Sequence, residues 1–181
     1  YDRYLDWAFA AGTTDNGVFG AKLMWGYFGD FVALLRTIPS YRDLPLVDLL
    51  PAVFPDVQFV RVMRASKVRQ AVSLWKAVQT ATWSEAHDAD RQAASPPYQS
   101  FLEEHRPGLR FHYRAIEHLL NQILQQEAFW DTFFEHTGIK PVLVLYENFA
   151  GDETTSTRHL LNRLGLPPPD DASLSPPLRR Q

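Results

Sequence analysis

Three apolar runs along the chain predict buried β-strands. They are VFGAKLMW (Val18 to Trp25), VQFVRVM (Val57 to Met63) and PVLVLYE (Pro141 to Glu147). The third run is almost continuously apolar, which is typical of a parallel strand that is covered on both faces of its sheet. The three runs therefore predict a mostly parallel sheet.

Apolar residues also recur at the spacing of a helix, and they predict three helices. The helices are expected over residues 69–83, 111–136 and 155–164. The second and third are followed by Gly138 and Gly165, and glycine is the preferred residue just past a helix C-terminus. Strands that alternate with helices indicate an α/β fold, with helices flanking the sheet.

The segment RASKVRQAVSLWKA begins where the second strand is expected to give way to the first helix. Arg64 stands at the carboxyl end of the strand, which is where open α/β sheets bind their ligands. Ser66 can cap the helix, and Lys67 adds a positive charge beside N–H groups that already attract anions. These features predict a phosphate site. The alternative is that Ser66 only caps the helix and that Arg64 pairs with a nearby acid.

The two faces of this helix extend the hypothesis. A polar stripe at positions i, i+4 and i+7 contains Ser66, Gln70 and Ser73. An apolar stripe that is expected to face the core contains Val68, Val72 and Trp75. The hydroxyl of Ser73 would then lie on the outward face and could join the Arg64 guanidinium on a phosphate.

Composition and charge narrow the classes of function. The 181 residues, which suit one domain, carry 18 Lys and Arg against 21 Asp and Glu, and the net charge of −3 does not favour nucleic acid as a partner. No window reaches the roughly eighteen apolar residues of a membrane span. The absence of cysteine excludes thiol catalysis and disulfides and suits a reducing compartment, so we expect a cytoplasmic location. The motifs of P-loop kinases, zinc proteases and serine hydrolases are absent, and no metal is expected.

Residues 86–108 differ from their surroundings, because they combine acids, small residues and three prolines. They predict either a surface connection with a short helix or a lid over a site that would also contact the acceptor.

Four motifs resemble one known family. NGVFGAKLMW, KVRQAVSLWKAVQT, YENF and the terminal LRRQ occur in the order found in the bacterial trehalose 2-sulfotransferase-like family. The resemblance implies a P-loop-like, three-layer α/β domain. It also implies an enzyme that takes a sulfonate group from 3′-phosphoadenosine-5′-phosphosulfate (PAPS) and places it on a hydroxyl, usually of a carbohydrate.

The resemblance further implies roles for residues that bind the donor. A strand-ending arginine and a serine in the following helix hold the 3′-phosphate, and these positions match Arg64 and Ser73. Tyr146 matches a tyrosine that packs on adenine, although it could equally be a structural strand end. Arg180 lies in a segment that would close over the nucleotide.

Lys22 matches the lysine of a Lys-x-His pair that stabilises charge during transfer, but Met24 replaces the histidine, so no general base is assigned. Burying a lysine in an apolar strand is costly, and this favours a role in the site. Trp25 and Trp83 are candidates for the acceptor pocket, and core packing is an equal alternative for Trp25.

The chain is expected to be a segment cut at both ends, without the N-terminal strand and the loop that holds the 5′-phosphosulfate. If those elements are absent from the whole protein, the alternative function is a non-catalytic module that binds a nucleotide or a protein partner. The long helix over 111–136 carries aromatic residues that would suit a homodimer interface.

Overall fold

The computed structural model describes residues 1–80 and 108–167, and these fall into two compact units. The first unit contains residues 1–58 and 126–140. The second contains the described residues of 59–125 and of the chain beyond 140. The long helix α7, Tyr113–Thr137, supplies its first half to the second unit and its second half to the first.

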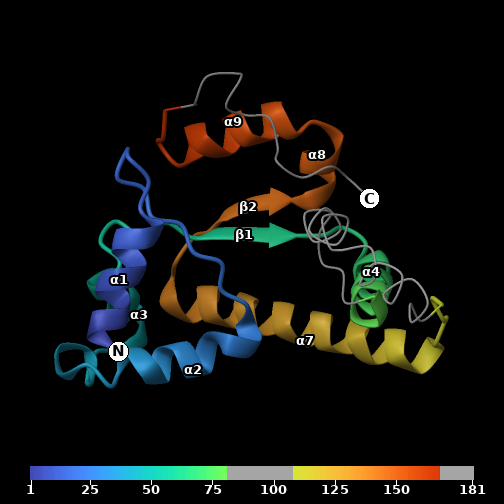
Figure 1. Ribbon diagram of the computed structural model, residues 1–181, viewed down its shortest axis with the longest axis horizontal. Helices are drawn as coiled ribbons and strands as arrows, with labels where there is room; N and C mark the ends of the chain where they lie inside the picture. Colours follow the sequence, from blue (N-terminus) through green and yellow to red (C-terminus); the bar gives the residue numbers. More distant parts are fainter. Residues whose placement is uncertain (81–107, 168–181) are drawn as a thin grey trace, which may run out of the picture. The chain divides into compact units, whose positions relative to one another are not determined.

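Among the described elements, both strands come after an initial run of helices, and helices follow each of them (Figure 1). In order, they are α1 (Asp2–Gly12), α2 (Trp25–Leu35), the 3-10 helix η1 (Pro39–Tyr41), α3 (Leu46–Val53), β1 (Val60–Met63), α4 (Lys67–Thr80), α7 (Tyr113–Thr137), β2 (Val142–Leu145), α8 (Tyr146–Gly151) and α9 (Glu153–Arg163).

The three predicted helices are confirmed as α4, α7 and α9. Helix α4 extends to Thr80, the last residue described before residue 108. Gly138 and Gly165 both adopt a φ of +69°, as expected for glycines that end helices. None of the helices in the described part of the chain combines the length and the hydropathy that a membrane span requires.

The first unit has a helical core that the sequence patterns did not predict. Leu35 of α2 and Leu49 of α3 are fully buried, and Ile38, Leu50 and Val53 are nearly so. Helix α2 has apolar residues on most of its circumference and two glycines, so it lacks the one-sided periodicity that marks a surface helix.

The strand predicted over Val18 to Trp25 is wrong. Hydrogen bonds from Thr14 N to the Val18 carbonyl (3.0 Å) and from Gly17 N to the Thr14 carbonyl (2.8 Å) form a tight turn instead. Gly17, with a φ of +80°, supplies the left-handed backbone of this turn. After this turn, residues 20–24 do not pair with any strand in the described part of the chain, and Trp25 is already the first residue of α2.

The second unit contains a two-stranded parallel sheet, which Figure 1 shows as β1 and β2 side by side and pointing the same way. The register runs from Val60 opposite Val142 to Met63 opposite Leu145. The other two predicted strands are thus confirmed in shorter form. The described residues are a mixed fold of helices and strands with a small parallel sheet, while the three-layer, P-loop-like arrangement and the single domain stay predictions.

The core of the second unit corrects the predicted face of α4. Ala71 is fully buried against Ile116 and Ile123 of α7. Leu74 and Trp75 of α4 pack on the same cluster, together with Leu119 and Leu120. Val68 and Val72, which were expected to face the core, are 57 % and 45 % exposed. Trp75 packs on the core as predicted, whereas Ala71 and Leu74 take the places expected of Val68 and Val72, so the buried face of α4 lies to one side of the predicted stripe.

Candidate functional site

The site predicted at the end of β1 is assembled by the parallel register. Because Met63 lies opposite Leu145, the next residues, Arg64 and Tyr146, leave the same end of the sheet. The Arg64 guanidinium carbon lies 3.8 Å from the centroid of the Tyr146 ring, which is a cation–π contact. The structure thereby brings together two residues that were both predicted to bind the nucleotide. Tyr146 is 43 % exposed and is the first residue of α8 rather than the last of a strand.

Glu147 follows Tyr146 and binds the turn between β1 and α4. Both of its carboxylate oxygens accept the backbone N–H of Ala65, at 3.1 and 3.0 Å. This hydrogen bond is the largest cause that lowers the pKa of Glu147 below its ordinary value. The N–H groups of Glu147 itself and of Ser66, and the positive charge of Arg64, also lower the pKa, while desolvation acts in the opposite direction.

The turn therefore binds an anion, but one that the chain supplies. The sequence suggested that a phosphate would take N–H groups at the start of α4, whereas the N–H groups of Ala65 and Ser66 interact with Glu147. In this arrangement a phosphate at the same edge would depend mainly on the side chains of Arg64 and Ser73.

The predicted residues on α4 take different positions. The hydroxyl of Ser66 accepts the N–H of Arg69 at 3.3 Å, as the capping alternative expected. Lys67 is the first residue of the helix. Ser73 lies two turns further on and is exposed, and its hydroxyl has no hydrogen-bond partner among residues 1–80 and 108–167. That hydroxyl is accessible to a ligand.

The C-terminal part of α4 is hydrogen-bonded to Arg110, which lies in the segment just before α7. The indole N–H of Trp75 donates to the Arg110 carbonyl at 2.8 Å, and the Arg110 N–H donates to the Gln79 side-chain oxygen at 2.8 Å. Trp83, Arg180 and the predicted lid up to residue 107 lie outside the described residues.

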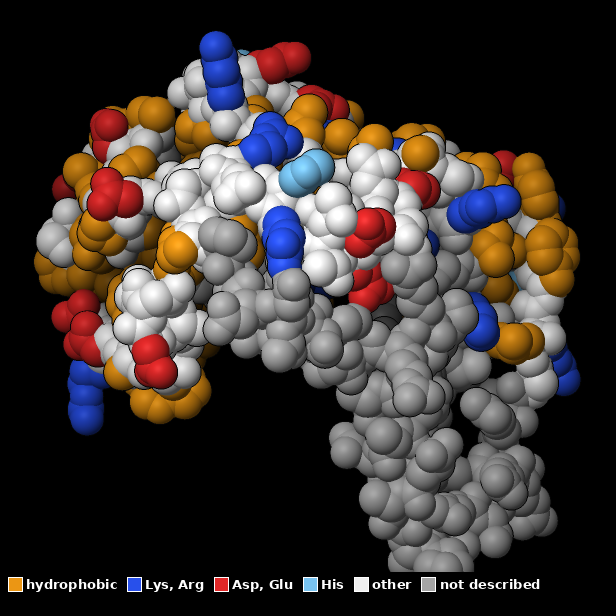
Figure 2. Space-filling view, turned by 90° about the horizontal axis from the view of Figure 1, so that it is seen from above, with side chains coloured by type: hydrophobic (Ala, Val, Ile, Leu, Met, Phe, Trp, Pro, Cys, Tyr) orange, Lys and Arg blue, Asp and Glu red, His pale blue; other side chains and the backbone are white. Residues whose placement is uncertain are grey.

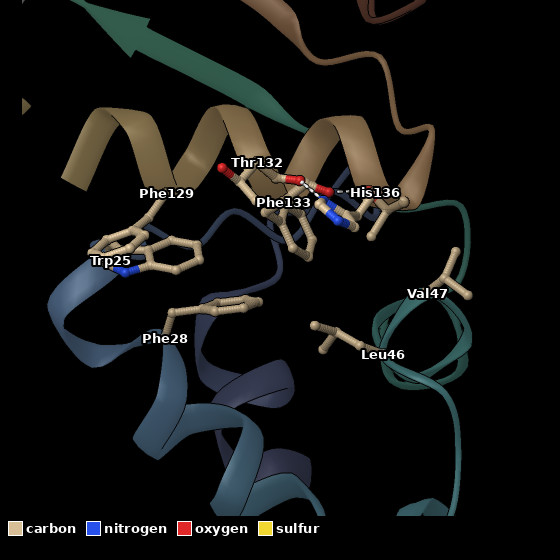
Figure 3. Close-up of a pocket in the computed structure, with 9 residues that line it drawn as sticks. Trp25, Phe28, Leu46, Val47, Phe129, Thr132, Phe133 and His136 are labelled. Carbon is tan, nitrogen blue, oxygen red and sulfur yellow. Dashed lines mark hydrogen bonds between the residues drawn. The ribbon is translucent and has the colours of Figure 1, made fainter. Parts of the chain in front are cut away.

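Trp25 lines a pocket in the first unit, with a volume of about 450 Å³. Figure 3 shows side chains from α2, α3 and α7 around it. The lining residues are Trp25, Phe28, Leu46, Val47, Phe129, Thr132, Phe133, His136 and Thr137. The Trp25 ring also packs against Phe28, Phe129 and Trp130, with centroids 5.2, 5.4 and 4.9 Å away.

This pocket offers few polar groups to a ligand. The hydroxyls of Thr132 and Thr137 donate to carbonyls of their own helix, at 2.9 and 2.8 Å. The His136 Nδ1 lies 2.8 Å from the Thr132 carbonyl oxygen.

Lys22 is exposed and lies in the irregular stretch before α2, so the argument that a buried lysine must serve a site does not hold for it.

Charge is mixed rather than gathered on the face that carries α8 and α9. Figure 2 shows basic and acidic side chains next to one another there. Helix α9 illustrates this mixture, because it contains the acidic Glu153 together with Arg158, His159 and Arg163. In the described ranges, no three His, Asp or Glu side chains come together as a metal site would require.

Sequence reasoning missed the part that Glu147 plays. A partial signal was present in the two strand ends, because Arg64-Ala65 and Tyr146-Glu147 follow two strands that were both expected in a mostly parallel sheet. Continuing the register by two residues places Glu147 beside Ala65, as the structure does.

Comparison with known proteins identifies the family. The family model described as Stf0 sulphotransferase matches residues 1–181. A trehalose 2-sulfotransferase of Mycobacterium tuberculosis is 31 % identical over 176 residues, which cover 94 % of this chain and 58 % of that protein. A trehalose 2-sulfotransferase of Mycolicibacterium smegmatis is 29 % identical over 166 residues, or 91 % of this chain and 57 % of that protein. The chain thus spans a little under three fifths of these relatives. The resemblance read from the sequence motifs is confirmed, and the chain belongs to the Stf0 sulphotransferase family.

Proposed function

We propose that the protein containing this chain is a PAPS-dependent sulfotransferase that places a sulfonate group on a hydroxyl of a carbohydrate. The family match over the whole chain carries this proposal. The names of the two relatives support trehalose, or a sugar like it, as the acceptor.

The donor nucleotide would bind at the end of the parallel sheet. Arg64 presents a planar guanidinium that can bind a phosphate through two parallel hydrogen bonds, and the exposed Ser73 hydroxyl can add a third. Arg64 covers one face of the Tyr146 ring, and the other face suits the adenine. Ser66, Lys67 and Arg180 remain proposed contacts to the same nucleotide.

The transfer itself would be an in-line displacement at sulfur. The bond from sulfur to the bridging oxygen of the donor breaks while the acceptor oxygen bonds to sulfur and loses its proton, and adenosine 3′,5′-bisphosphate leaves. We assign Lys22 to the stabilisation of negative charge during this step, because its ammonium group is exposed and accessible. The base that takes the acceptor proton has no assignment, since Met24 stands where a histidine was sought.

Trp25 and Trp83 remain proposed contacts to the acceptor. An indole face suits the C–H face of a sugar ring, although the pocket beside Trp25 offers few hydrogen bonds to sugar hydroxyls. The three-layer, P-loop-like sheet, the homodimer and the cytoplasmic location belong to the same proposal.

Two measurements test this function. Calorimetric titration should show adenosine 3′,5′-bisphosphate binding to the chain. Arg64→Ala should weaken that binding by about 2 kcal/mol, or roughly thirtyfold. Arg69→Ala removes an equal charge from an exposed position of α4 and should change the affinity little.

The second measurement is transfer of labelled sulfonate from PAPS to trehalose by the whole protein. Equal affinities for the parent and Arg64→Ala would contradict the phosphate site. Binding of the bisphosphate without transfer to trehalose or to any of a panel of sugars would instead favour the non-catalytic module.

A further inference from the structure

Two consecutive residues that follow β2, Tyr146 and Glu147, hold Arg64 in place. Its guanidinium rests on Tyr146, and the peptide that follows it donates the Ala65 N–H to Glu147. On its other side, Met63 is held in the sheet by Leu145. The backbone on both sides of Arg64 and the tip of its side chain are therefore fixed by residues 145–147.

We propose that Glu147 is a positioning residue for the nucleotide phosphate, and that it acts through Arg64. This inference rests on the proposed function, since it concerns the same donor site. By holding the Ala65 N–H, Glu147 fixes the turn that follows β1 and so keeps the Arg64 guanidinium over Tyr146. A guanidinium that is already held loses less freedom when it binds a phosphate.

A carboxylate so close to a phosphate has a second effect of opposite sign. Its negative charge repels the ligand, and if repulsion dominated, removing the charge would tighten binding. The geometry favours positioning, because both oxygens of Glu147 already accept a backbone N–H and its charge is met by Ala65, Ser66 and Arg64. Such a carboxylate projects less charge toward a ligand than an unpaired one.

Glu147→Gln separates the two effects. Glutamine has nearly the same shape but is neutral and presents a single acceptor oxygen, and its NH2 group cannot accept the Ala65 N–H. We expect the affinity for adenosine 3′,5′-bisphosphate to fall about fivefold to twentyfold in this variant, the range of a weakened charged hydrogen bond. Glu117→Gln is the matched control, because it removes a carboxylate from α7 whose partner is the Tyr113 hydroxyl at 3.3 Å.

The decisive readout is the coupling between Glu147 and Arg64. If Glu147 acts through Arg64, Glu147→Gln should leave the affinity within about twofold in an Arg64→Ala background, measured by titration at high ligand concentration. A merely structural role would lower affinity by the same factor in both backgrounds. That outcome, or tighter binding by Glu147→Gln, overturns the proposal.

The outcomes also separate this inference from the proposed function. No binding of the bisphosphate by the parent chain contradicts the donor site as a whole. Binding by the parent with unchanged affinity in Glu147→Gln contradicts positioning alone. Should Glu147→Gln fail to fold, Glu147→Asp carries the same test, since it keeps the charge but shortens the reach. A smaller loss is then expected, and it should vanish with Arg64→Ala.

Discussion

Arg64 and Tyr146 come from distant parts of the chain, yet the guanidinium carbon of one lies 3.8 Å above the ring of the other. The contact exists because β1 and β2 are parallel neighbours in a register that ends both strands at the same edge. Such a pair combines a phosphate-binding group with a flat surface for a base, which are the two things that a nucleotide bisphosphate requires.

The Tyr146 ring is expected to matter more than its hydroxyl. Tyr146→Phe keeps the ring face under Arg64 and should bind adenosine 3′,5′-bisphosphate within about twofold of the parent. Tyr146→Ala removes both the cation–π contact and the surface for adenine, and should cost about 1–3 kcal/mol of binding free energy. Titration calorimetry measures both, and an alanine variant that binds as tightly as the phenylalanine variant would exclude this role for the ring.

Acid should remove the contribution of Glu147 to stability. The folded-state pKa of Glu147 lies below its ordinary value of 4.5. Its stabilising effect is therefore fully present above about pH 4.5 and is lost as the pH falls through the lowered pKa. We expect the difference in melting temperature between the parent and Glu147→Gln to be largest near neutral pH and to shrink below about pH 4.5.

Thermal melts between pH 7 and pH 3 check this expectation, with Glu117→Gln as the control for loss of a carboxylate in the same unit. A difference that stays constant over this range, or that grows in acid, would show that the hydrogen bond to Ala65 does not favour the ionised form.

Two adjacent leucines at the end of α2 should differ sharply. Leu35 is fully buried, whereas Leu34 is 45 % exposed. Leu35→Ala leaves a cavity in the core of the first unit and should lower the free energy of unfolding by about 2–5 kcal/mol. Leu34→Ala removes the same atoms from a half-exposed position and should cost less than about 1 kcal/mol. Urea denaturation measures both, and similar losses would mean that the described core is wrong.

Much of the fold could be predicted from local sequence patterns alone. The spacing of apolar residues and the glycines at 138 and 165 predicted α4, α7 and α9, because a helix forms its hydrogen bonds within one segment. The same locality placed Arg64 after a strand and Ser66 at the start of a helix, and the motifs around them led to the family.

The tertiary structure decided what depends on neighbours. The apolar run from Val18 to Trp25 became a turn and the start of a helix, because a strand needs an adjacent strand to bond with. Ala71 rather than Val68 or Val72 faces α7, since the partner surface selects which side of α4 is buried. The bond from Ala65 to Glu147 spans 82 residues and depends on the pairing of β1 with β2, an interaction that no local pattern encodes.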